Sequence, residues 1–419
     1  MKRIIPFTLL ILSTTLLWAQ SSKGYLMIVG GALADENKLV YERMLSTAGG
    51  AEKAKIAIIP SASGSPVSSA EAFINACERY GVKRENCSIV PLATEDDEDT
   101  KEVNESTWAT NGNETSVVNM IKNADFVWFT GGDQMRTMRV LKPDGIETKA
   151  FKALLTVLDK GGIIGGSSAG AAIQSDVMIG GGSSIGALSL GTTDQYRTQA
   201  EEASGILLLT KGCGFFADGI NDQHFERKAR LGRLIVANWE NREKYPLGFG
   251  IDENTGLFVD RKARIVEVIG AAGVSIIDVR KAQSTRTSDG YTFNNIEVSL
   301  LENGDKLSLS NMELQPQPLK KPASGEDSDN IRQEMLSGAM SSFSSTVHDL
   351  LTYSLIDNYT NQKVENYTFL NQNKAFKLVF SKTPDTKGFY TSLPDDGDHY
   401  TVWRVRCDIE PVSIEIIKK

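Results

Sequence analysis

The 419-residue sequence is poor in the residue types that build metal and redox sites. It contains three histidines and four cysteines, and no two cysteines form a Cys-x-x-Cys pair (Cys77, Cys87, Cys213, Cys407). These counts exclude a zinc ribbon, a histidine-rich metal site and a fold held together by a disulfide framework. In an oxidising compartment Cys77 and Cys87 could pair, or both could remain buried thiols, and the sequence leaves that choice open.

The chain also lacks an excess of positive charge. It has 45 lysines and arginines against 53 aspartates and glutamates, a formal net charge of −8. Nucleic acids and anionic membranes are bound by basic surfaces that replace counterions. The composition therefore argues against both kinds of partner, although a local basic pocket is compatible with it.

Long hydrophobic segments are scarce as well, and the longest lies at the N-terminus. Residues 4–18 are largely apolar, follow Lys2 and Arg3, and lead through Ala19 into a polar segment. The run is shorter than the roughly 20 residues that span a bilayer. This pattern predicts a signal peptide at residues 1–19 and a secreted or periplasmic protein without stable membrane insertion after cleavage.

From residue 24 onward, short apolar runs alternate with helical patterns. Strands are predicted at residues 25–29, 56–59, 125–129 and 162–164, with helices of about ten residues between most of them. Such alternation is typical of a parallel sheet covered by helices on both faces. The near-continuous hydrophobicity of the strands fits burial on both sides.

The pattern changes in the last third of the chain. Residues 315–329 are rich in proline, glycine and charge, which is typical of a linker. Beyond it we predict an amphipathic helix over residues 331–351 and several short strands. We therefore divide the mature chain into an α/β domain, residues 20–315, and a small α+β appendage, residues 316–419, of unknown role.

A candidate nucleophile follows the strand that ends near Ile164. Residues 166–170 read Gly-Ser-Ser-Ala-Gly, which fits G-x-S-x-G, and a helical stretch comes next. In a strand–turn–helix setting this pattern lifts a serine hydroxyl clear of the sheet. Ser168 is the expected nucleophile, and the N–H of Ala169 would face the attacked carbonyl oxygen. The alternative is an ordinary turn with a capping serine.

A serine nucleophile needs a base, and the supply of histidine is small. His348 and His399 lie in the appendage, so His224 is the candidate in the α/β domain. We predict that His224 opens a helix over residues 225–239. The cations that cluster there suggest recognition of carboxylates, although arginines on a helix usually face solvent (Arg227, Lys228, Arg230, Arg233).

A third residue should orient the imidazole. The predicted strand at residues 247–251 ends in two carboxylates, Asp252 and Glu253. The sequence pattern alone does not choose between them.

Together these segments resemble the cyanophycinase branch of the S51 serine peptidases, which also includes peptidase E. The resemblance spans roughly residues 24–310 and rests on five ordered motifs. They are Phe-Thr-Gly-Gly-Asp-Gln at 129–134, Gly-Ser-Ser-Ala-Gly-Ala at 166–171, Ser-Asp-Val-Met-Ile at 175–179, Asp-Gln-His-Phe at 222–225 and Gly-Ile-Asp-Glu at 250–253.

The resemblance implies a flavodoxin-like, class I glutamine amidotransferase-like three-layer αβα sandwich. It makes residues 20–315 the catalytic domain and places Ser168, His224 and Glu253 in a catalytic triad. The oxyanion hole would combine the N–H of Ala169 with one from the loop that contains Gly132. The family can also form homodimers, although the sequence does not show this.

The same resemblance suggests the substrate. Cyanophycinases cut cyanophycin, a polyaspartate with arginine on each β-carboxyl group, into β-Asp-Arg dipeptides. The positions that would contact it are Gln134, Asp222, Gln223, Lys228, Arg230 and Arg233. One position departs from the family pattern, because Lys228 replaces an arginine and cannot form a bidentate pair with a carboxylate.

We therefore predict a serine hydrolase of aspartate-rich peptides that needs no metal or organic cofactor. One alternative is an aspartyl or isoaspartyl exopeptidase of the same family that does not act on cyanophycin. A second alternative is a catalytically silent binding protein on this fold.

Overall fold

The computed structural model describes residues 23–323, 325, 346–371, 373–393, 397–415 and 417. The predicted signal peptide at residues 1–19 lies outside these ranges, as does most of the predicted helix at 331–351. Its last residues are described and form the short helix α10 (Val347–Leu351). Within these ranges, no helix combines the length and the hydropathy that a membrane span requires.

Within the described residues, nine strands form a sheet that we call the core sheet. Its order is β17 (Glu313–Gln315), β16 (Lys306–Ser308), β12 (Ile265–Gly270), β11 (Thr255–Asp260), β1 (Tyr25–Val29), β5 (Ile163–Ser167), β4 (Phe126–Phe129), β2 (Ile56–Ile59) and β3 (Cys87–Ile89). In this order, the neighbours along β1, β5, β4, β2 and β3 pair in parallel. The neighbours along β1, β11, β12, β16 and β17 pair antiparallel.

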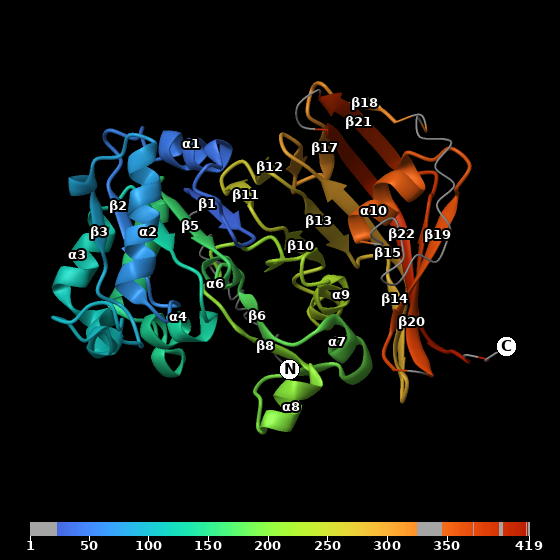
Figure 1. The fold of residues 1–419 in the computed structure, drawn as a ribbon, viewed down its shortest axis with the longest axis horizontal. Helices are drawn as coiled ribbons and strands as arrows, with labels where there is room; N and C mark the ends of the chain where they lie inside the picture. Colours follow the sequence, from blue (N-terminus) through green and yellow to red (C-terminus); the bar gives the residue numbers. More distant parts are fainter. Residues whose placement is uncertain are drawn as a thin grey trace, which may run out of the picture.

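Helices cover both faces of the parallel part (Figure 1). Side chains from α1 (Lys38–Thr47) and α2 (Pro66–Arg79) pack with Met27 and Val29 of β1. Those from α3 (Thr115–Asn123), α4 (Gln134–Leu141) and α5 (Lys149–Asp159) pack in the cluster that holds Leu26 and Ile28. Because successive residues of β1 point to opposite faces, a continuously apolar strand serves both clusters. The predicted three-layer α/β sandwich is confirmed.

Ten further strands in the described part of the chain form a second sheet, the C-terminal sheet. Its main order is β18 (Lys321–Pro322), β21 (Lys387–Leu393), β22 (Gly397–Ser413), β15 (Gly290–Leu301), β13 (Val274–Asp278), β10 (Leu247–Ile251) and β9 (Ile220–Asp222). On its branches, β14 (Gln283–Thr287) pairs with β15, and β19 (Lys363–Phe369) pairs with β20 (Lys374–Ser381), which pairs with β22.

The predicted appendage contributes strands to this sheet rather than a sheet of its own. β22 pairs with β15 over several residues, including Val298 with Val405. A buried side chain adds to this connection: the ammonium of Lys320 contacts Asp305 at 2.9 Å, the carbonyl of Tyr400 and the hydroxyl of Thr401. Residues on both sides of the predicted linker thus share one hydrogen-bonded sheet, and the boundary at residue 315 remains a prediction.

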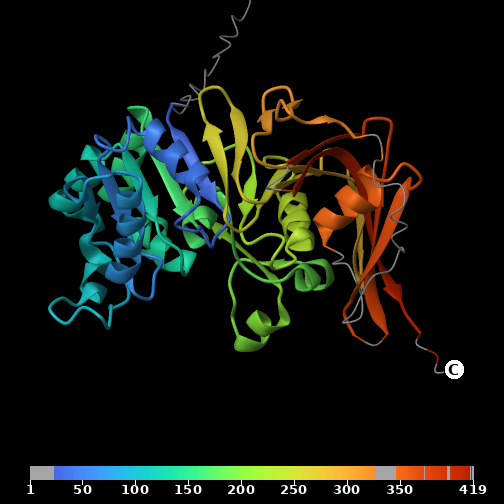
Figure 2. The same ribbon diagram turned by 45° about the horizontal axis from the view of Figure 1, so that its top comes forward.

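The remaining elements connect the two sheets. A small sheet contains β6 (Val177–Gly181), β8 (Leu207–Lys211) and β7 (Thr192–Thr193). The helices here are α6 (Ala169–Ala172), α7 (Ser184–Leu190), α8 (Gln199–Ser204) and α9 (Leu231–Glu240), and α8 projects from the body in both views (Figures 1 and 2). Short 3-10 turns lie at Arg84–Asn86, Glu105–Asn113 and Pro143–Gly145, and a π turn at Thr352–Ile356.

All four cysteines are free thiols in the structure, with Cys77 buried in the packing of α2.

Candidate active site

Ser168 lies on a sharp turn between β5 and α6. Its backbone has φ 55° and ψ −111°, a conformation that side-chain-bearing residues rarely adopt. The turn is possible because its flanking glycines leave room: a Cβ on Gly166 would lie 2.4 Å from the carbonyl oxygen of Gly170. The sequence thus builds the strained turn that the G-x-S-x-G pattern predicts.

His224 faces this serine from the segment after β9. Its Nε2 lies 2.9 Å from the Oγ of Ser168, and its Nδ1 lies 2.6 Å from Oε1 of Glu253. If Nδ1 carries the proton and donates to the carboxylate, Nε2 is free to accept the serine proton. The structure therefore joins Ser168, His224 and Glu253 into one chain of hydrogen bonds.

The backbone around His224 differs from the predicted helix at residues 225–239. The helix α9 begins only at Leu231, and the intervening segment is a series of turns with positive φ at His224 (47°) and Ala229 (49°). A left-handed residue cannot continue a right-handed helix. The apolar spacing of α9 was visible in the sequence, whereas the turn that carries the base was not.

A glycine in the β1 loop makes room for the imidazole. Gly31 has φ 114°, and a Cβ placed there would lie 2.2 Å from the His224 ring. Two backbone hydrogen bonds fix this loop, from the His224 N–H to the Gly30 carbonyl at 2.6 Å and from the Asn254 N–H to the Gly31 carbonyl at 2.8 Å. In the sequence, the only signal for Gly31 is the glycine pair, Gly30 and Gly31, that ends the first strand.

The two carboxylates after β10 have different surroundings. Glu253 reaches His224, whereas the buried Asp252 accepts hydrogen bonds from the backbone N–H groups of Glu226 at 3.0 Å and Gly273 at 3.2 Å. Asp252 also lies 3.3 Å from Nε2 of His348. In this geometry Glu253, and not Asp252, is placed to orient the imidazole.

The expected oxyanion loop also lies beside the serine. A Cβ on Gly131 would be 3.4 Å from the Cβ of Ser168, and Gly132 has φ 138° with the carbonyl of Ala62 only 1.9 Å from its Cβ position. Only glycine fits at such a position. Ala169 begins α6 directly after the serine. Donation by Ala169 and Gly132 to an oxyanion stays a prediction.

Burial has the largest influence on the pKa of His224. It lowers the pKa of the imidazole from its usual value, and the positive charges of Lys228 and Arg230 act in the same direction. The hydrogen bond to Glu253 opposes them. The result favours a neutral imidazole, the form that can accept a proton.

The six predicted substrate-binding residues fall into two groups. Arg233 is buried and donates to the carboxylate of Asp222 and to the carbonyl of Gly182, and Arg230 also donates toward Asp222 at 3.5 Å. Desolvation lowers the pKa of Arg230 to about 10. Asp222 and Arg233 thus satisfy each other inside the protein, and their contribution to substrate binding stays a prediction.

The other three residues have less complete partners. The amide nitrogen of Gln134 donates to the carbonyls of Ile179 and Gly180, each at 3.1 Å. The buried Oε1 of Gln223 has no hydrogen-bond partner. Lys228 is exposed and has no carboxylate partner among the described residues, and partial burial together with Arg230 and Arg233 lowers its pKa. Of the three predicted substrate-binding cations, Lys228 is therefore the most available to a ligand.

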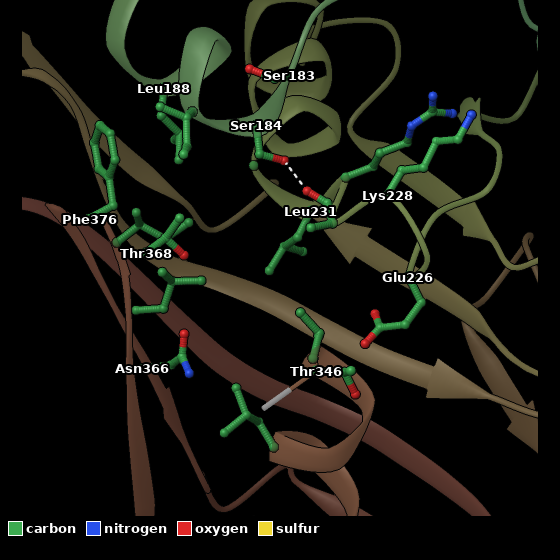
Figure 3. A pocket seen from close by; sticks show the side chains of 18 residues that line it. Ser183, Ser184, Leu188, Glu226, Lys228, Leu231, Thr346, Asn366, Thr368 and Phe376 are labelled. Atoms are coloured by element: carbon green, nitrogen blue, oxygen red, sulfur yellow. Dashed lines mark hydrogen bonds between the residues drawn. The ribbon is translucent and has the colours of Figure 1, made fainter. Parts of the chain in front are cut away.

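The segment between β9 and α9, residues 223–230, carries His224, and we call it the base loop. A cavity of about 490 Å³ lies next to it. Its walls come from α7, the start of α9, α10 and strands β19, β20 and β22. The lining is mostly apolar and includes Leu188, Leu231 and Phe376, while Lys228 extends away from the centre of the cavity (Figure 3). No described group of three or more His, Cys, Asp or Glu side chains is arranged to hold a metal ion.

Comparison with known proteins identifies the family of the chain. Residues 26–266 match the model of peptidase family S51. The chain belongs to this family. It is a serine-type peptidase, as the resemblance predicted.

Relatives of this S51 peptidase include two cyanophycinases. That of Trichormus variabilis is 30% identical over 299 residues, which cover 69% of this chain and 87% of the relative. That of Geminocystis herdmanii is 28% identical over 295 residues, covering 68% and 94%. A crystal structure of a peptidase from an acI-B1 Actinobacterium is 20% identical, with a TM-score of 0.43, and covers 70% of this chain and 100% of that one.

Proposed function

We propose that this S51 peptidase is secreted or periplasmic and hydrolyses the aspartyl backbone of cyanophycin, or of a closely related aspartate-rich peptide, to β-Asp-Arg dipeptides. The observation that carries the proposal is the hydrogen-bonded chain from Ser168 through His224 to Glu253. The names of the relatives supply the substrate. The apolar run before residue 19 supplies the location.

The geometry supports acyl transfer. Ser168 Oγ attacks the amide carbonyl carbon while its proton passes to Nε2 of His224. The C–N bond then breaks, and His224 returns the proton to the leaving amine. Water, deprotonated by His224, attacks the acyl carbon; the bond from this carbon to Ser168 Oγ breaks, His224 returns the proton to Oγ, and the carboxylate product leaves. Glu253 holds the imidazole and stabilises its positive charge, and the Ala169 and Gly132 N–H groups would bind the oxyanion.

Lys228 favours a second candidate, an aspartyl or isoaspartyl exopeptidase of the same family. Its flexible ammonium can attract a carboxylate as a point charge but cannot hold it in the fixed two-bond geometry of an arginine. This candidate uses the same reaction and differs only in substrate.

The test is incubation of the mature protein, starting at Gln20, with purified cyanophycin, followed by mass spectrometry. The matched control is Ser168→Ala, and a fluorophosphonate probe reports serine reactivity in both proteins. We expect β-Asp-Arg dipeptides and labelling from the wild type alone. Labelling without dipeptide release would favour the exopeptidase. Absence of both would reject the hydrolase proposal and favour a silent binding protein.

A further inference from the structure

Asp252 connects the base loop to the short segment after β10, residues 252–254, which carries Glu253 and which we call the acid loop. One oxygen of the Asp252 carboxylate accepts the N–H of Glu226, two residues after His224. The other accepts the N–H of Gly273, and the backbone N–H of Asp252 donates to the Gly273 carbonyl at 3.2 Å. Since Asp252 directly precedes Glu253, its side chain connects the segment of the base to the segment of the acid.

The carboxylate of Asp252 is held by a residue far along the chain. His348, on α10, places Nε2 at 3.3 Å from Oδ2 of Asp252. Among the described residues, it is the only basic side chain within ion-pair distance of Asp252. Among the described residues, the carboxylate of Glu226 on the base loop also lies close to Asp252 and repels it.

The position of His348 is closely defined by its neighbours. A Cβ on Gly273, the residue before β13, would lie 3.1 Å from Cε1 of His348, so the backbone approaches the imidazole closely here. The hydroxyl of Ser275, buried on β13, lies 3.4 Å from Nε2. The backbone N–H of His348 also points to Glu226 Oε1 at 3.5 Å. α10 is anchored beneath by Leu350 and Leu351, which belong to the apolar cluster of the C-terminal sheet.

Burial makes this contact matter. The carboxylate of Asp252 is desolvated, and this raises its pKa to about 6, with His348 opposing the rise. Neutral pH lies above this pKa, so the buried carboxylate is mostly charged there, and a buried charge needs a partner. Without His348, Asp252 would be free to protonate or to turn toward water, and its hydrogen bond to the base loop would weaken.

We propose that His348 is a positioning residue of the active site: by contacting Asp252 it holds the loops of Glu253 and His224 in the alignment that lets Glu253 orient the base. The C-terminal region thereby completes the active site of the S51 domain. This inference rests on the proposed function only in taking Ser168 and His224 as the reacting pair. Residue 348 lies beyond the part of the chain that matches the family, residues 26–266.

The experiment compares the wild type with His348→Ala, His348→Gln and Asp252→Asn. The matched control is His399→Ala, because His399 is also a part-buried histidine of the C-terminal sheet paired with a carboxylate, Glu302, at 3.5 Å. The first readout is the rate at which a fluorophosphonate probe labels Ser168. The second is the downfield proton resonance of the hydrogen bond between His224 and Glu253. Thermal unfolding verifies that each variant is folded.

We expect His348→Ala and Asp252→Asn to slow labelling about 10-fold and to weaken the downfield resonance, since small misplacements of a catalytic pair are costly. His348→Gln keeps an N–H donor of similar reach and should recover part of the rate. His399→Ala should behave as wild type. If His348→Ala does not fold, His348→Gln and Asp252→Asn decide the question.

The outcomes separate this inference from the proposed function. Normal labelling and an unchanged resonance in folded His348 and Asp252 variants would overturn the positioning role and leave the hydrolase intact. A wild type that is not labelled would reject the hydrolase, and the resonance alone would then decide whether His348 positions Glu253 and His224.

Discussion

The two sheets contribute different parts of the candidate active site. The core sheet supplies the nucleophile and the glycine loops around it, because β5 ends at Ser167 and β4 leads into Gly131 and Gly132. The C-terminal sheet supplies the base and the acid, which follow β9 and β10. The site forms where the two sheets meet, and the backbone bonds to Gly30 and Gly31 cross that junction.

The candidate site has two halves: Ser168 with its glycine loops, and His224 with Glu253, which we call the C-terminal half. The two halves depend differently on the rest of the chain. The serine turn is defined locally, by glycines within a few residues of Ser168. The base and acid instead stand on a sheet whose pairing continues from β10 through β13 and β15 to β22. The predicted base and acid, His224 and Glu253, are therefore the part of the candidate site that is joined to the C-terminal region.

The largest expected effect tests which of the two carboxylates of the C-terminal half, Glu253 or Asp252, orients the imidazole. Glu253→Gln removes the charge that stabilises the imidazolium and alters the preferred tautomer, so we expect labelling of Ser168 to fall by about 10³- to 10⁴-fold. Asp252→Asn should cost much less. The measurement is the fluorophosphonate labelling rate at neutral pH. Equal losses in the two variants would contradict the assignment of Glu253 as the orienting acid.

A second prediction concerns the stability of the C-terminal half. Asp222→Asn leaves the buried Arg233 and the mostly buried Arg230 without a carboxylate, and breaking a buried ion pair typically costs about 3–5 kcal/mol. The control is Arg264→Met, which breaks a more exposed pair with Asp218 and should cost about 1 kcal/mol or less. Urea unfolding measures both. A small loss in Asp222→Asn would contradict the view that Asp222 compensates the buried charges of Arg233 and Arg230.

The smallest expected effect is a shift in pH dependence. Lys228 contributes to the lowered pKa of His224, so Lys228→Met should raise that pKa and keep the imidazole protonated up to a higher pH. Because only the neutral imidazole accepts the serine proton, the acid limb of the labelling rate should move toward higher pH. Lys228→Arg keeps the charge and should leave the limb in place. If the acid limb does not move in Lys228→Met, the charge of Lys228 does not contribute to the lowered pKa of His224.

Much of the core sheet could be predicted from sequence because its signals are local. The strand at residues 25–29 is continuously apolar, and the glycines around Ser168 predict both the turn and its place after a strand. The choice of Glu253 over Asp252 could not be made, because adjacent residues with the same charge differ only in the direction in which the backbone points them.

The second half of the site depends on contacts between distant residues. The apolar period that revealed α9 gave no sign that His224 and Ala229 adopt left-handed conformations. Nothing near His348 marks it as a neighbour of Asp252, from which it is separated by 96 positions. Its only sequence signal was the scarcity of histidine, which drew attention to each of the three without showing what two of them touch.

The buried ammonium of Lys320 bears on how such a protein could be built or divided. A gene truncated after residue 315 would encode a chain in which Asp305 is a buried charge without its cation, and β15 would lose the strand that covers one of its edges. An unpaired edge and an uncompensated charge both promote aggregation or unfolding. We therefore expect the C-terminal region not to separate as an independent module, so an exchange between relatives would have to transfer Lys320, Asp305 and β22 together.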